Sequence, residues 1–137
     1  MSTFLKFPEG FYWGAATSSY QVEGGIYNND WAYAAELGKV PKAGQSADQY
    51  NLYNDDFQLA KELGHNCHRI SIEWSRIEPE EGKFNQKEIE HYREVLVSLN
   101  EKGIKPFVTL WHFTLPIWFY KKGGFENKES AKIFARY

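Results

Sequence analysis

Segments of strand character alternate along this chain with segments of helical period, and this alternation is the feature that most restricts its fold. Strand character is expected at residues 11–18, 68–74 and 104–112, and helical period at residues 48–63, 85–103 and 127–137. Strands that alternate one by one with helices predict an α/β fold, with a parallel sheet joined by right-handed crossovers. The alternation does not separate a doubly wound sheet from a barrel.

Capping residues support two of the expected helices. Gly64 follows the first helix and is able to take the left-handed backbone conformation that ends a helix. Asn85 opens the second, and Glu88 three residues later makes an Asn variant of the capping box. The polar, glycine-rich stretch 19–46 is too long for an ordinary βα connection, and loops of this length tend to be functional or mobile.

The second expected strand favours a barrel. Arg69, Ser71 and Glu73 share one of its faces, and the apolar residues between them share the other. A strand of a doubly wound sheet is covered on both sides and is normally apolar throughout. An inward row of polar groups instead suits the interior of a barrel below a polar active site. A (β/α)8 TIM barrel needs eight units and typically ~250 residues. We therefore expect residues 1–137 to be a fragment of one such domain, with no internal boundary.

Composition and charge exclude several classes of partner. The net charge of −2 gives no basic surface for nucleic acid or for an anionic membrane. The N-terminal residues lack the apolar core of a signal peptide, and the most apolar stretch, 108–120, is too short to span a bilayer. The single cysteine, Cys67, cannot form an internal disulfide, which fits a reducing compartment. We expect a cytoplasmic protein with no membrane or nucleic-acid partner.

Several motifs occur in the order typical of one enzyme family. They are FPEGFYWGAATSSYQVEGG at 7–25, HRISIEWSRI at 68–77, EGKFN at 81–85, TLWHFTLP at 109–116, Gly123-Gly124 and the final FARY. Together they cover nearly the whole chain, which resembles the N-terminal portion of glycoside hydrolase family 1. That family comprises β-glucosidases, β-galactosidases, 6-phospho-β-glycosidases and myrosinases. The resemblance implies that the chain is the first three βα units of a (β/α)8 barrel and that the substrate is a small β-glycoside or oligosaccharide.

The resemblance also implies a retaining hydrolase of O-glycosidic bonds, which needs two carboxylates roughly 5 Å apart. In the family one lies in an Asn-Glu-Pro motif after the fourth strand, and the other in a Glu-Asn-Gly motif at the seventh. Neither motif occurs in this chain: Glu78-Pro79 lacks the asparagine, and Glu126-Asn127 lacks the glycine. We therefore expect no catalytic residue here, no cofactor and no activity from these 137 residues alone.

Two residues are expected to bind the sugar. Gln21 lies just past the first strand, at the edge where barrel active sites are built, and its amide can both donate to and accept from sugar hydroxyls. The resemblance assigns it to the non-reducing sugar; a loop-capping glutamine is the alternative. His112 ends the third strand at the same edge, and the resemblance assigns it to the same sugar ring.

Two neighbouring positions complete the expected site. Phe113 stands where the family commonly has tryptophan, so its ring can pack on a sugar but the indole donor is lost. The resemblance has Arg69 contact the catalytic nucleophile, where a cation would keep that carboxylate ionised. In this chain Glu73 is an alternative ionic partner for Arg69. His65 and His68 do not share a strand face and have no evident third ligand, so we expect no metal site.

A second hypothesis is a non-catalytic or vestigial fragment that retains weak sugar binding through Gln21 and His112. Neither the preferred sugar, nor the aglycone, nor the oligomeric state follows from the sequence.

Overall fold

A computed structural model describes residues 5–137. Residues 1–4 lie outside the described residues. They include part of the N-terminal segment that lacks the apolar core of a signal peptide. The sheet has three parallel strands in the order β1-β2-β3, namely β1 (Gly14–Ala16), β2 (Cys67–Ser71) and β3 (Lys105–Thr109). Arg69 in the central strand pairs with Ala16 on one side and with Phe107 on the other. The parallel sheet expected from the alternation is confirmed.

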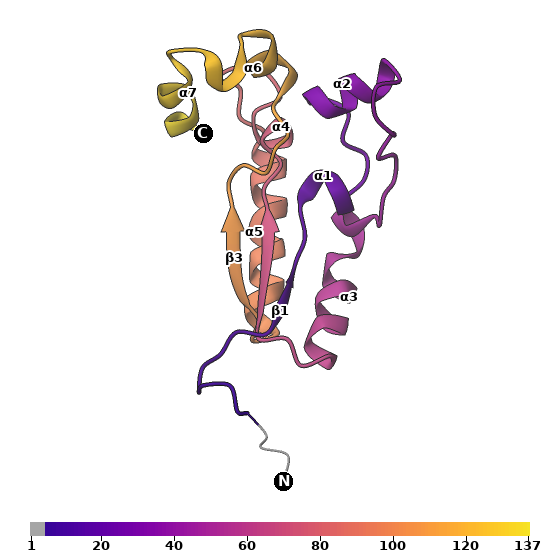
Figure 1. Cartoon of the computed structure of the whole chain (residues 1–137), viewed down its shortest axis with the longest axis vertical. Coiled ribbons are helices and arrows are strands. Elements are labelled where there is room, and N and C mark those ends of the chain that lie inside the picture. Colours follow the sequence, from indigo (N-terminus) through magenta and orange to yellow (C-terminus); the bar gives the residue numbers. More distant parts are fainter. Residues whose placement is uncertain (1–4) are drawn as a thin grey trace.

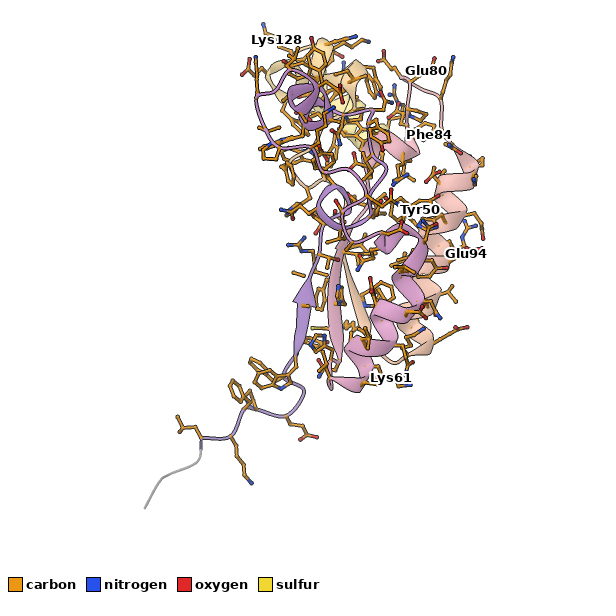
Figure 2. All side chains as sticks on the ribbon, turned by 90° about the vertical axis from the view of Figure 1, so that its right-hand side faces the viewer. Tyr50, Lys61, Glu80, Phe84, Glu94 and Lys128 are labelled. Atoms are coloured by element: carbon orange, nitrogen blue, oxygen red, sulfur yellow. The ribbon has the colours of Figure 1, made fainter. Side chains whose placement is uncertain are left out.

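Two long helices cover one face of this sheet. They are α3 (Gln49–Glu62), which leads from β1 to β2, and α5 (Gln86–Glu101), which leads from β2 to β3. Figure 2 shows both helices on the same side of the strands. The core between helices and sheet consists of Phe57, Ala60, Ile70, Val95, Leu99 and Ile104. Its apolar side chains lose contact with water on folding, and this drives the helices onto the sheet.

Short helices gather beyond the carboxyl ends of the strands (Figure 1). They are α1 (Ser19–Val22), α2 (Asp30–Glu36), α4 (Trp74–Ile77), α6 (Ile117–Lys121), the 3-10 helix η1 (Gly124–Glu126) and α7 (Ser130–Arg136). A second apolar cluster, built on Trp74, Phe119 and Ile133, holds α4, α6 and α7 together.

The structure confirms the two predicted helix ends but not the predicted capping box. Gly64 takes the left-handed conformation at φ 82°, and the Asn85 side chain accepts from the Lys87 amide at 3.1 Å, so both helix ends are confirmed. The capping box is not formed, because the Glu88 carboxylate accepts from the Tyr50 hydroxyl at 3.1 and 3.2 Å instead. A contact across two helices has replaced the local one.

Several boundaries differ from those expected. The strand expected at 11–18 is paired only at Gly14–Ala16, and the stretch 19–46 contains α1 and α2, which are too short to show a helical period. The strand expected at 68–74 ends at Ser71, because Glu73 is the N-cap of α4. The last helix begins at Ser130 rather than 127.

The face of the sheet opposite α3 and α5 is left uncovered. Phe107, which pairs with Arg69, is 43% exposed on this face. Val108, which pairs with the core residue Ile70, and Leu110 lie on the helix side of the edge strand β3 and are 41% and 53% exposed. A groove of about 380 Å³ opens beside α5, between Phe84, Leu96, Leu110 and Tyr137. Within residues 5–137, no helix has the length and hydrophobicity required to cross a bilayer.

Candidate functional site

The candidate site lies at the edge where the three parallel strands end. Backbone bonds keep these ends in register: the Thr17 amide donates to the Arg69 carbonyl at 2.9 Å, and the Ile72 amide donates to the Thr109 carbonyl at 3.0 Å. Gln21 follows β1, Arg69 lies within β2, and His112 follows β3. The fold thus brings residues from three distant parts of the sequence to one edge of the sheet.

Arg69 is half-buried at this edge. Its Nη1 donates to the Thr17 carbonyl at 2.7 Å, which ties the end of β1 to β2. The ion pairs of residues 5–137 do not include the expected alternative pair between Arg69 and Glu73. Because β2 ends at Ser71 and the chain turns into α4, the alternation that would have placed the two side chains on one face is interrupted.

His112 is half-buried beside a cation. Burial lowers the pKa of its imidazole, and the charge of Arg69 lowers that pKa further. Both effects favour the neutral ring at neutral pH, with one nitrogen donating and the other accepting. A ring of this kind suits a ligand with adjacent hydroxyl groups, each of which can donate and accept.

Phe113 lies in a strained turn. Its φ is 58°, and the Thr114 amide donates to the His112 carbonyl at 2.9 Å across it. A bulky residue with positive φ is uncommon, and such strain persists where the surrounding structure enforces it. The phenyl ring contacts the edges of Trp31 and Tyr20, at centroid distances of 5.1 and 6.1 Å. Trp31, which is 41% exposed, is an aromatic neighbour that the sequence did not single out, since it lies in the long polar stretch.

Gln21 is exposed on α1. Its Oε1 accepts from the Ser18 hydroxyl at 2.5 Å, the kind of local bond that a loop-capping glutamine makes. Because the side chain is exposed at the edge of the site, it is accessible to a ligand. Gln21 is joined to the rest of the site through the backbone of β1 and the contacts of α1.

Glu73 lies just past the carboxyl end of β2, as the N-cap of α4. The residue is fully buried, and its carboxylate accepts from the hydroxyls of Ser75 at 2.6 Å, Ser19 at 3.1 Å and Thr114 at 3.1 Å. These donors belong to α4, to α1 and to the segment after His112. The predicted structural role of Glu73 is thus carried by hydroxyl donors instead of an arginine.

Other groups considered in the sequence lie away from the site. The His68 ring is buried against Phe57, at a centroid distance of 5.4 Å, and its Nε2 is 3.3 Å from the Thr17 hydroxyl. Glu78 is fully buried, accepts from Trp74 Nε1 at 2.9 Å and pairs with Arg136. In the described part of the chain, no three His, Cys, Asp or Glu side chains are grouped closely enough to hold a metal ion.

Known proteins are similar to this chain in sequence and in fold. Residues 4–137 match the model of glycosyl hydrolase family 1. The chain is 42% identical over 142 positions to β-glucosidase A of Thermotoga maritima, covering 96% of this chain and 32% of that protein. It is 37% identical over 145 positions to the 6-phospho-β-glucosidase GmuD of Bacillus subtilis, with 96% and 31% covered. The solved β-glycosidase from Pyrococcus horikoshii superposes with a TM-score of 0.89 at 52% identity, over 93% of this chain and 30% of that one.

The chain spans about a third of the length of these relatives. Within that third, the match extends over nearly every described element, including the strand ends that carry Gln21, Arg69 and His112. The chain therefore belongs to glycosyl hydrolase family 1.

Proposed function

We propose that the chain supplies part of the sugar-binding wall of a retaining β-glycosidase that hydrolyses O-glycosidic bonds of small β-glycosides or oligosaccharides. The observation that carries this proposal is that Gln21 and His112 follow the carboxyl ends of the parallel strands β1 and β3, with Arg69 in the strand between them. In (β/α)8 barrels this is the end at which active sites are built. β1 to β3 are then the first three of eight strands.

Each residue has a role that suits its surroundings. The exposed amide of Gln21 and the neutral imidazole of His112 hydrogen-bond the hydroxyls of one sugar ring. Phe113 packs against the apolar face of that sugar. Arg69, already at the edge through its bond to the Thr17 carbonyl, lies beside the nucleophilic carboxylate and favours its ionised form. Both catalytic carboxylates belong to later parts of the barrel.

The uncovered face of the sheet supports the same proposal. Phe107 on that face, and Val108 and Leu110 on the helix side of the edge strand β3, are each more than two-fifths exposed, and monomeric proteins rarely leave such apolar surface in contact with water. Closure of the sheet into a barrel would cover it. Residues 1–137 are then one part of a single domain in a cytoplasmic enzyme.

The first test is to sequence the DNA past the Tyr137 codon and to assay the product of the complete reading frame on an aryl β-glucoside. We expect turnover by that product and none by the 137-residue chain. Gln21→Ala and His112→Ala are each expected to lower kcat/KM by about 10-fold to 100-fold, since each removes hydrogen bonds to the sugar. Gln58→Ala, an exposed change on α3, is the matched control. Turnover by the 137-residue chain, or unchanged kcat/KM in both variants, contradicts the proposal.

A stop codon directly after Tyr137 would favour a non-catalytic sugar-binding fragment. The accessibility of Gln21 in the described structure is the observation that supports this alternative. Titration calorimetry of the chain with glucose tests it, and the absence of heat at high millimolar sugar removes it.

A further inference from the structure

Helix α1, which carries Gln21, is four residues long. A helix this short has no stability of its own, so its orientation depends on tertiary contacts. Those contacts concentrate on the residue that ends it. Glu23 is the C-cap of α1, its amide donates to the Ser19 carbonyl at 2.9 Å, and the residue is 7% exposed.

Three other helices hold Glu23. From α4, Arg76 Nε donates to the carboxylate at 3.0 Å. From α5, the Tyr92 hydroxyl donates to the two carboxylate oxygens, at 2.9 and 3.0 Å. From α3, the Tyr50 amide donates to the Glu23 carbonyl at 3.4 Å. Figure 2 shows Tyr50 where α3 lies beside α5.

Arg76 and Tyr92, the two side chains that donate to the Glu23 carboxylate, form a clamp. Its Arg76 side chain also holds the backbone that leaves α1. Arg76 Nη2 donates to the Gly24 carbonyl at 2.7 Å, while its guanidinium lies 4.3 Å from the centre of the Tyr50 ring. A planar guanidinium that donates in two directions and stacks on a ring has little freedom to rotate. One side chain thereby holds both the carboxylate of Glu23 and the peptide that follows it.

We propose that Glu23, clamped by Arg76 and Tyr92, is a positioning residue that fixes α1 and so presents Gln21 at the edge of the sheet. The inference rests on the proposed role of Gln21 in binding the sugar. Glu23 lies two positions after Gln21, and Val22, the one residue between them, is half-buried. Displacement of Glu23 from its clamp therefore displaces the helical turn that carries the amide.

Glu23, the residue that the clamp holds, titrates near neutral pH. The titratable and charged groups that face Glu23 are Arg76, Tyr92, Tyr50 and Glu73, and His91 lines the same small cavity. Burial raises the pKa of Glu23 to about 7, against the lowering effects of Arg76 and of the Tyr92 hydrogen bond. A change in the ionisation of Glu23 should therefore be detectable at the backbone amide of Gln21.

The test is nitrogen-15 NMR of the 137-residue chain between pH 5 and pH 9, with backbone order parameters measured for Gln21 and Val22. In the wild type we expect the Gln21 amide signal to titrate with a midpoint of about 7. Tyr92→Phe should raise that midpoint, because the lost hydroxyl favoured the ionised carboxylate. Glu23→Gln should abolish the titration.

Glu23→Ala should lower the order parameters of Gln21 and Val22 from about 0.85 to below about 0.6, the change from rigid to flexible backbone. Glu36→Gln, an exposed carboxylate on α2, is the matched control and should change neither measurement. The inference is overturned if the order parameters persist in Glu23→Ala, or if Tyr92→Phe leaves the midpoint at Gln21 unchanged. Should Glu23→Ala fail to fold, the midpoints of the milder Tyr92→Phe and Glu23→Gln variants decide the matter.

A separate measurement tests the proposed function. Unchanged kcat/KM in Gln21→Ala would remove the sugar role of Gln21, whereas the order parameters and midpoints concern only the clamp.

Discussion

Replacement of Glu23 by glutamine is expected to remove a loss of stability that the wild-type chain suffers as the pH rises. Burial raises the pKa of the Glu23 carboxyl from 4.5 to about 7 in the folded chain. The folded state therefore binds this proton more tightly than the unfolded state does. The resulting stabilisation is fully present below about pH 4.5, is lost as the pH rises through about 7, and is absent above that.

The magnitude follows from the two pKa values. A shift of one pKa unit between the unfolded and folded states corresponds to about 1.4 kcal/mol. A pKa of about 7 in place of 4.5 therefore corresponds to about 3 kcal/mol in the free energy of unfolding. Glutamine has nearly the same shape and does not titrate. The stability of Glu23→Gln relative to the wild type should consequently improve by about 3 kcal/mol between pH 4 and pH 8.

Urea unfolding of both chains across this pH range measures the difference, and every other titrating group cancels between them. Glu36→Gln serves as the control, because its carboxylate is 66% exposed and its pair with Lys42 lies in solvent. A difference between Glu23→Gln and the wild type that stays within about 0.5 kcal/mol from pH 4 to pH 8 would refute the reasoning.

Three further predictions concern the supports of the site. Glu73→Ala should destabilise the chain by about 3–5 kcal/mol in urea unfolding, since it leaves several buried hydroxyl donors without their acceptor; a loss below about 1 kcal/mol contradicts this. Phe57→Ala should cost about 3–5 kcal/mol in the same assay, because Phe57 is fully buried between α3 and the sheet, whereas the 58% exposed Leu59 changed to alanine should cost far less. Gly14→Val should prevent pairing of β1 with β2, because a Cβ at this position would lie 2.0 Å from the Cys67 carbonyl oxygen; normal amide-exchange protection of β1 in that variant would be the contrary result.

Local signals in the sequence account for much of the sheet and its long helices. The end of α3 at Gly64 and the start of α5 at Asn85 depend on backbone conformation and on hydrogen bonds within a few residues, which a sequence encodes directly. The parallel order of the strands follows from their alternation with helices. The family motifs placed Gln21 and His112 near strand ends, where the structure has them.

The contacts of buried polar side chains were decided by the tertiary structure. Glu73 is 19 residues from Tyr92, 41 from Thr114 and 54 from Ser19 in sequence, so its partners are set by how α1, α4 and α5 meet. The expected pair with Arg69 assumed that β2 continues to residue 74, and the turn into α4 after Ser71 removed it.

The sequence by itself determined the α/β class of the fold, the end of α3, the start of α5 and the family, because periodicity, capping and motif spacing act over short distances along the chain. Only the tertiary structure decided that Glu23 is enclosed by three helices, that its pKa is raised to about 7, and that Phe113 lies in a strained turn against Trp31. These properties depend on burial and on partners distant in sequence. Desolvation of a carboxyl group is a consequence of everything packed around it, and no short stretch of residues encodes that.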